Sequence, residues 1–271
     1  MTEHDTEIRL SLILPVHRGA EWIGENLRAV ADALSVRDRG FELIVICDGD
    51  DDFASVEAGL VAAEDPRVRV FHYPQNQGKG FAVSFGVAQA RGELIGWLDA
   101  DLDIDPEVIL RAESRFGEAV IDAAIGSKRH VDSTVDYPAA RRVYSAVYQL
   151  LVRSLFGLNI RDTQVGAKLF RREMLTTIIP LLLCKQHAFD LEVLAVGAEF
   201  GFDRVEEVPI HLAYRFTGTS MNWRAVHNIV LDTLAIGYRL HVRHWYAKRF
   251  ADRARRQRSV AGRRGLVGAG R

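Results

Sequence analysis

Residues 9–15, Arg-Leu-Ser-Leu-Ile-Leu-Pro, and residues 41–47, Phe-Glu-Leu-Ile-Val-Ile-Cys, are two short apolar runs that decide the fold. Runs of this length and composition are typical of strands buried on both faces of a parallel sheet. Between them, large apolar residues recur at helical spacing over residues 21–36. The chain is therefore predicted to open with strand, helix and strand, the unit of a parallel α/β sheet.

The same alternation continues along the chain. We expect further strands at 68–72, 93–98, 121–126, 166–170 and 204–216, and helices at 53–63, 80–90, 106–119, 138–156, 171–183, 188–200 and 222–247. This order predicts an α/β fold with a mostly parallel sheet flanked by helices. No second domain boundary is visible, so residues 1–250 are predicted to form one domain.

Composition is that of a globular chain. Its 271 residues are 48% hydrophobic and 26% charged, which excludes a disordered chain, and no apolar run is long enough for a membrane span. The first residues are acidic and lack a signal-peptide pattern, so we expect the protein in the cytoplasm. The two cysteines, Cys47 and Cys184, follow apolar runs and are predicted to be buried free thiols.

Charge is distributed unevenly. Residues 248–271 hold nine Lys or Arg and one acid, a net +8, which leaves residues 1–247 with −9. The Gly, Ala and Arg composition of residues 251–271 predicts a disordered basic tail, which either lies on anionic lipid or is merely solvated. Nucleic acid is not an expected partner, because the acidic body offers no basic face to continue the contact.

An acidic cluster follows the predicted strand 93–98. Asp99, Asp101, Asp103 and Asp105 alternate with other residues just past the strand end, where ligands bind in open parallel sheets. Clustered carboxylates repel one another unless a cation is present, so they indicate a hard divalent metal such as Mg²⁺ or Mn²⁺.

Three alternatives to a metal site at the strand end compete for this cluster. An EF-hand loop from Asp99 needs Gly and Glu where Ile104 and Leu110 stand, which excludes it. A phosphatase of the haloacid dehalogenase type favours Thr or Val where Asp103 stands and has its motif on the first strand. A purely structural role stays open, because Asp105-Pro106 is a good helix start.

Two more candidate ligand-binding segments directly follow predicted strands. Asp48-Gly49-Asp50-Asp51-Asp52 follows strand 41–47, and Asn76-Gln77-Gly78-Lys79-Gly80 follows strand 68–72 and opens a helix. The glycines of the second segment permit close backbone approach, and Lys79 could meet a phosphate. The segment matches neither a dinucleotide-binding fingerprint nor a Walker loop, so alone it is weak evidence.

Taken together, six motifs resemble glycosyltransferase family 2, and within it the dolichyl- or polyprenyl-phosphate sugar synthases. They are Leu14-Pro15-Val16-His17, Ile46-Cys47-Asp48-Gly49, Asn76-Gln77-Gly78-Lys79-Gly80, Asp99-Ala-Asp101, Gly126-Ser127-Lys128-Arg129 and Asp162-Thr-Gln-Val-Gly-Ala-Lys-Leu-Phe170. The resemblance spans about residues 9–245. It implies a GT-A fold in which a nucleotide sugar lies across the strand ends.

The resemblance also implies roles for individual residues. Donor roles fall on Pro15, His17 and Glu21 in the nucleotide pocket, Asp48 at the base or ribose, Lys79 and Asp99 at the nucleotide sugar, and Asp99, Asp101 and Asp103 at the metal and diphosphate. Acceptor-phosphate roles fall on Lys128, Arg129 and Arg141 or Arg142, with Gln164 nearby. Asp101, Lys128, Arg129 and Gln164 make up the expected catalytic set. His17 stands where family members usually have Tyr or Phe.

The expected reaction is metal-dependent transfer of a sugar from a nucleotide to a polyprenyl phosphate, with inversion implied by the family. A phosphate monoester is already anionic at neutral pH, so no general base is assigned. The aromatic and basic helix 138–156, helix 222–247 and the basic tail predict peripheral attachment to the inner membrane face. Two alternatives stay open: a soluble transferase with a small phosphorylated acceptor, and a catalytically idle nucleotide-binding module. The oligomeric state and the sugar are not predicted.

Overall fold

The computed structural model describes the backbone of residues 7–37, 39–134, 139–186, 188–212 and 223–268. Side chains are described over the same ranges except for 139–146, 223–226 and 257–268. The strands are β1 (Ile8–Val16), β2 (Gly40–Asp48), β3 (Val68–Tyr73), β4 (Leu94–Leu98), β5 (Ala123–Ser127), β6 (Ala167–Arg171) and β7 (Val205–Pro209). The helices are α1 (Ile23–Leu34), α2 (Ala54–Glu64), α3 (Lys79–Gln89), α4 (Glu107–Glu118), α5 (Ala139–Phe156), α6 (Arg172–Ile178), α7 (Phe189–Glu199), α8 (Trp223–Gly237) and α9 (Trp245–Gly268).

The strands form one sheet with the order β3-β2-β1-β4-β6-β5-β7. Neighbouring strands run parallel except β6, which is antiparallel to both β4 and β5. The predicted mostly parallel sheet is confirmed. Because β6 runs the other way, its first residue, Ala167, pairs with the last residue of β4, Leu98. The segment before β6 therefore reaches the same sheet edge as the ends of the parallel strands.

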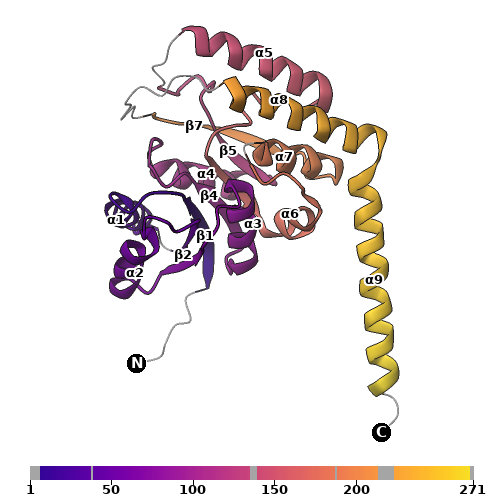
Figure 1. Cartoon of the computed structure of the whole chain (residues 1–271), viewed down its shortest axis with the longest axis horizontal. Coiled ribbons are helices and arrows are strands. Elements are labelled where there is room, and N and C mark those ends of the chain that lie inside the picture. Colours follow the sequence, from indigo (N-terminus) through magenta and orange to yellow (C-terminus); the bar gives the residue numbers. More distant parts are fainter. Residues whose placement is uncertain (1–6, 38, 135–138, 187, 213–222, 269–271) are drawn as a thin grey trace.

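Alternate residues of the strands face two separate layers of helices. In β1, Leu10, Leu12 and Leu14 pack with α1, α2 and α4, whereas Ile13 packs with α3, α6 and α7 on the opposite face. This two-residue period follows from strand geometry, and burial on both faces explains why β1 and β2 are almost continuously apolar. Figure 1 shows α1 and α2 on one side of β1 and β2, with α3 on the other.

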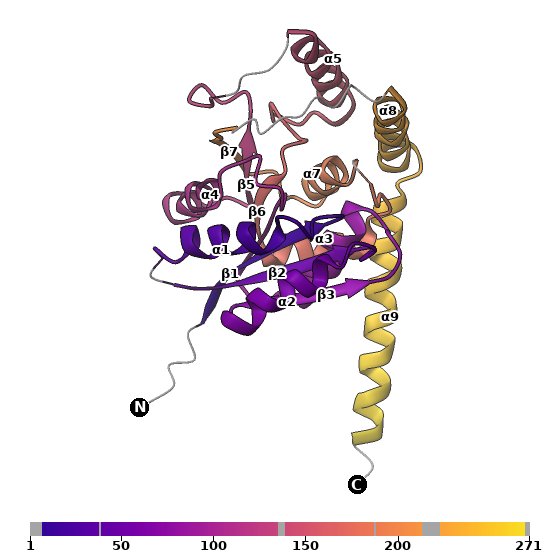
Figure 2. The ribbon, with the colours of Figure 1, turned by 60° about the vertical axis from the view of Figure 1, so that its left-hand side comes forward.

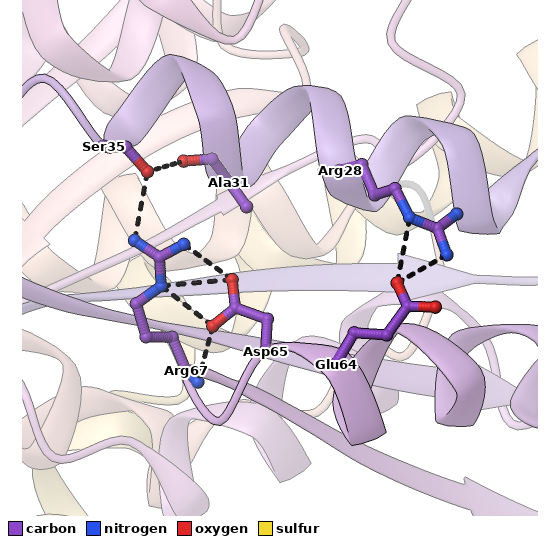
Figure 3. Close-up of polar contacts among 6 residues, drawn as sticks. All are labelled: Arg28, Ala31, Ser35, Glu64, Asp65 and Arg67. Atoms are coloured by element: carbon purple, nitrogen blue, oxygen red, sulfur yellow. Dashed lines mark hydrogen bonds and ion pairs between the residues drawn. The ribbon is translucent and has the colours of Figure 1, made fainter.

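Polar contacts at the surface join α1 to α2 and to the turn before β3. Arg28 of α1 donates two hydrogen bonds to Glu64 of α2, and Arg67 bridges Asp65 and Ser35 (Figure 3). Hydrogen bonds from Arg67 hold the pKa of Asp65 below its usual range. Exposed ion pairs of this kind stabilise a fold by only about 1 kcal/mol or less, so the apolar layers dominate.

The C-terminal part differs from its prediction in two ways. The predicted helix 222–247 is not continuous: α8 ends at Gly237, a π-helical turn covers Tyr238–Val242, and His244 has a positive φ of 47° before α9 begins. The segment predicted to be a disordered tail is instead described as helix α9 as far as Gly268. The prediction rested on missing large apolar residues, but Ala and Arg are among the strongest helix formers. Figures 1 and 2 show α9 projecting away from the rest of the chain.

Two smaller elements are also shorter than predicted. The helix expected at 171–183 is α6 followed by a 3₁₀ turn, Ile179–Leu181. Of the strand expected at 204–216, β7 covers Val205–Pro209, and residues 213–216 lie outside the described part.

A buried carboxylate fixes the bend between α8 and α9. Glu192 of α7 accepts hydrogen bonds from the backbone N–H groups of Leu183 and Cys184, from the Tyr246 hydroxyl at 2.5 Å and from Arg239 at 3.3 Å. Residues 239 and 246 would lie about 10 Å apart along a straight helix. The bend lets both side chains reach the same Glu192 oxygen. Burial and the Glu192 carboxylate raise the pKa of the Tyr246 phenol, so this hydroxyl stays a donor.

Glu192→Ala is expected to lower the free energy of unfolding by about 3–5 kcal/mol, because it leaves the Arg239 charge and two backbone N–H groups without their partner. Urea denaturation followed by circular dichroism measures this loss. Glu199→Ala is the control, since Glu199 is exposed on the same helix and its loss should change stability by no more than about 0.5 kcal/mol. Equal stabilities of the two variants would contradict the assigned role of Glu192.

Candidate functional site

The ends of β1, β2, β4 and β5 and the start of β6 meet at one edge of the sheet. Each of the six motifs quoted in the sequence analysis follows one of these ends or leads into β6 or α3. The topology therefore brings together motifs that are far apart in the sequence, at the edge where open α/β sheets bind ligands.

The second acidic segment mainly holds loops in place. Both Asp48 carboxylate oxygens accept backbone hydrogen bonds, from Gln77 at 2.6 Å and Gly78 at 2.8 Å, and Asp48 is buried. Asp52 accepts hydrogen bonds from the N–H groups of Ala20 and Ala54. Burial opposes ionisation of Asp52, but these hydrogen bonds keep its pKa below the usual range. Asp48 thus positions the loop that begins α3. The predicted contact between Asp48 and the base or ribose of a nucleotide stays a prediction.

The expected nucleotide-pocket residues lie around this loop. His17 is exposed just past β1, and its Nδ1 lies 2.8 Å from the Asp48 carbonyl oxygen. Pro15 is half-buried within β1 and pairs with Ile46, while Glu21 is exposed before α1. The structure thus brings Pro15, His17 and Asp48 together at the adjacent ends of β1 and β2.

Lys79 and Asp99 form the polar centre of the site. The Lys79 ammonium at the start of α3 lies 2.5 Å from Asp99 Oδ1, and Asp99 N–H donates to the Gly166 carbonyl oxygen at 3.1 Å. A Cβ at residue 166 would overlap the Asp99 carboxylate, so only glycine leaves room for it. Asp99 and Asp190 raise the pKa of Lys79 despite the lowering effect of burial, which keeps this side chain charged.

Asp101 and Asp103 add further carboxylates next to the Lys79–Asp99 pair. The Asp103 N–H donates to Asp101 Oδ1 at 3.3 Å. Desolvation by the surrounding protein, followed by repulsion from Asp99 and Asp103, raises the pKa of Asp101. A neighbouring cation would relieve that repulsion. Asp105 has a different role, since it accepts the Glu107 N–H at the start of α4, as the capping alternative predicts.

These carboxylates fit a divalent ion that is completed by a ligand. Among the side chains that the structure describes, no three acidic, histidine or cysteine groups form a cage able to hold an ion alone. Mg²⁺ in nucleotide sites is commonly held by one or two carboxylates together with substrate phosphates. The hard oxygen donors and the raised pKa of Asp101 fit such a partial site.

The basic segment after β5 is tied to the segment before β6. Asp162 accepts the backbone N–H of Lys128 at 3.3 Å and that of Gln164 at 3.2 Å. The Gln164 side chain in turn reaches the Tyr148 hydroxyl at 3.5 Å. Lys128 is half-buried and Arg129 exposed. Arg141 and Arg142 belong to the first turn of α5, and their side chains lie outside the described part.

Two buried residues of the site were missed by sequence analysis. Asp190 and Lys168 lie 2.8 Å apart, and the Trp97 indole donates to Asp190 at 3.0 Å. Lys168 stood inside the motif at 162–170, and a lysine within an otherwise apolar strand was the signal that could have singled it out. Asp190 offered no comparable signal, because one acid near the start of a helix is common.

The arrangement suits the binding of phosphate groups at two places. Lys79 and a divalent ion at the acidic cluster would neutralise one phosphorylated ligand, and the Lys128 and Arg129 segment would neutralise another. Lys and Arg bind phosphates through charge-assisted hydrogen bonds.

Comparison with known proteins agrees with this geometry. The profile described as Glycosyl transferase family 2 matches residues 11–179. Glycosyltransferase AglD of Haloferax volcanii is 32% identical over 205 residues, which cover 75% of this chain and 33% of that protein. The dolichyl-phosphate beta-glucosyltransferase of Saccharomyces cerevisiae is 29% identical, over 78% of this chain and 69% of the yeast protein. The chain thus spans a third of the first relative's length.

Among solved structures, the fold is similar to that of glucosyl-3-phosphoglycerate synthase from Mycobacterium tuberculosis in complex with Mn²⁺ and UDP-glucose. The TM-score is 0.63 at 19% identity, and the match covers 85% of this chain and 79% of the other. At this identity the likeness establishes the fold, which confirms the predicted GT-A architecture.

Proposed function

Because the chain belongs to glycosyltransferase family 2, we propose that it transfers a sugar from a nucleotide sugar to a polyprenyl phosphate. The observation that carries the proposal is the pairing of an acidic cluster with Lys79 and, across the same strand ends, a basic segment at Lys128 and Arg129. The yeast relative is named for a dolichyl-phosphate acceptor, which supports a lipid phosphate as the second substrate.

The donor side would use Lys79, Asp99, Asp101 and Asp103. We propose that Asp101, with Asp99 and Asp103, holds Mg²⁺ or Mn²⁺ and that Lys79 contacts the diphosphate. When bound, the ion would act as a Lewis acid that stabilises the departing nucleoside diphosphate. Pro15 and His17 lie at the end of the neighbouring strand β1 and would border the nucleotide, while Asp48 keeps the Lys79 loop in position.

The acceptor side would use Lys128, Arg129 and Gln164. A phosphate monoester carries an ionised oxygen at neutral pH, since its second pKa is near 6. That oxygen attacks the anomeric carbon of the sugar, the bond from this carbon to the diphosphate breaks, and the electron pair leaves with the diphosphate. Attack from the face opposite the leaving group inverts the anomeric carbon. The residues need only orient the phosphate, so no proton acceptor is required.

The membrane contact would be made by the outer helices. Val147 and Leu150 of α5 are 63% and 67% exposed, and α8 with its π-helical turn exposes Leu231, Leu234, Tyr238 and Val242 at helical spacing. Within the described residues, no helix is long and apolar enough to cross a bilayer. These exposed apolar rows fit helices that lie in the membrane interface, and the basic α9 follows them directly along the chain. We propose peripheral attachment to the cytoplasmic face.

The three candidate activities differ in their products. Incubation with a panel of labelled nucleotide sugars and polyprenyl phosphate should give label that extracts into organic solvent. Label that stays in the aqueous phase with 3-phosphoglycerate as acceptor would favour a soluble transferase with a small acceptor. Absence of any product would favour an idle nucleotide-binding module.

Asp101→Asn is expected to reduce transfer by roughly 100-fold, because the ion that stabilises the leaving group loses a ligand. The folded-state pKa of Asp101 is raised, so its ionised form weakens the fold at neutral pH and removing the charge should not lower the melting temperature. Chelator should abolish wild-type transfer, and Mg²⁺ or Mn²⁺ should restore it. Full turnover in excess chelator would refute the metal assignment.

Joint replacement Lys128→Ala and Arg129→Ala is expected to raise the KM for polyprenyl phosphate at least about tenfold, because each lost charged hydrogen bond contributes about 1.5–3 kcal/mol. The KM for the nucleotide sugar should stay nearly constant. Arg161→Ala is the matched control, since this exposed arginine pairs with Glu207. Equal increases in both KM values would assign the pair to the donor side.

Deletion of residues 251–271 removes seven arginines and one aspartate, a net +6, and is expected to weaken binding to anionic vesicles. Each basic group near such a surface contributes about 1 kcal/mol, less when screened by salt. Flotation with vesicles containing phosphatidylglycerol measures the loss, and neutral vesicles are the control. The triple change Arg253→Gln, Arg255→Gln and Arg256→Gln should give a partial loss with the helix retained. Identical flotation at low salt would exclude a membrane role for α9.

A further inference from the structure

Four side chains of alternating charge lead from the core to the site. Lys168 is fully buried in β6, next to Trp97 of β4 and Ile125 of β5. Its ammonium lies 2.8 Å from Asp190 Oδ1, Asp190 Oδ2 lies 3.8 Å from the Lys79 ammonium, and Lys79 lies 2.5 Å from Asp99. Exposure of the side chains rises along the series, from 0% at Lys168 to 40% at Asp99.

The inner end of this series is rigidly held. Asp190 is the second residue of α7, where the helix N-terminus favours a negative charge. It also accepts the Trp97 indole N–H at 3.0 Å, and Lys168 donates to the Val165 carbonyl oxygen. Removing one partner of a buried ion pair is costly, so Asp190 and Lys168 fix each other's positions.

Asp190 is too deeply buried to contact a substrate directly. Its side chain is 5% exposed, and Lys168 and Trp97 occupy the same oxygen, Oδ1. Lys168 and Lys79 hold the pKa of Asp190 below its usual range although burial opposes ionisation, so it remains a carboxylate. Its other oxygen faces Lys79, and this is the direction in which it can act.

Lys79 is shared between two carboxylates. Its hydrogen bond goes to Asp99, whereas Asp190 at 3.8 Å attracts it as an ion pair, so N–H donors of the ammonium remain for a ligand. Without Asp190, Lys79 would be drawn to Asp99 alone and would neutralise a carboxylate that the proposed metal needs.

We propose that Asp190 is a positioning residue that holds the Lys79 ammonium between itself and Asp99, where it can bind the diphosphate of the donor. The inference rests on the proposed transferase function, because that function places a diphosphate at Lys79. In this inference Asp190 acts only through Lys79 and takes no part in proton transfer.

A double-mutant cycle tests whether the two residues act together. The variants are Asp190→Asn, Lys79→Met and their combination, and the measurement is calorimetric binding of UDP and of GDP in the presence of Mn²⁺. Each single change should weaken binding of the preferred nucleotide roughly tenfold, the scale seen when the partner of a ligand-binding group is removed. The double variant should bind no more weakly than Lys79→Met, because Asp190 has no other route to the ligand.

A control separates positioning from stability. Asp190→Asn leaves the Lys168 charge in the core, so Lys168→Met combined with Asp190→Asn removes both buried charges and should preserve the fold. This pair should still show the tenfold loss, because Lys79 has lost the same partner. Thermal unfolding is recorded for every variant.

The outcomes are distinct. Additive losses in the double variant, or unchanged nucleotide binding in folded Lys168→Met with Asp190→Asn, would overturn the positioning role while leaving the proposed transferase intact. Failure of the wild-type protein to bind either nucleotide would instead overturn the proposed donor, and the inference with it.

Discussion

The antiparallel pairing of β6 with β4 and β5 is the constraint on which the site depends. It brings the segment before β6 to the carboxyl ends of the parallel strands, where the Gly166 carbonyl accepts the Asp99 N–H. The same segment carries Asp162, which accepts N–H groups from the Lys128 loop and from Gln164. One strand direction thus joins the acidic cluster to the basic segment, and a parallel β6 would start at the opposite edge of the sheet.

Helix α7 connects this site to the outer helices through two buried acids two residues apart. Asp190 faces the Lys79 and Lys168 ammonium groups, and Glu192 binds Arg239 and Tyr246 at the bend between α8 and α9. Each carboxylate is compensated by several donors, as a buried charge requires. The positions of the proposed donor site and of the proposed membrane layer are consequently set by the same short helix.

Electrostatic balance separates structural acids from those available to a ligand. Asp48 and Asp52 use their oxygens to accept loop N–H groups, and Asp190 is matched by two lysines. Asp101 is the exception, because desolvation and then the Asp99 and Asp103 carboxylates raise its pKa, while the Lys79 ammonium pairs with Asp99. This difference explains why the two acidic segments, which follow β2 and β4 on either side of β1, are assigned different roles.

The sequence by itself determined the α/β class, most elements and the motifs at the strand ends, because apolar periodicity and glycine placement are local signals. It also identified the family, whose motifs keep their order along the chain. The helix beyond residue 250 was not predicted, because the lack of large apolar residues there masked the helix propensity of Ala and Arg. Only the tertiary structure decided that Asp48 holds a loop, that Lys79 is shared, and that Asp190, Lys168 and Glu192 matter. Those roles depend on which hydrogen-bond donors, distant in sequence, contact a carboxylate in the core. Strand order and direction determine these contacts, and local sequence patterns do not encode them.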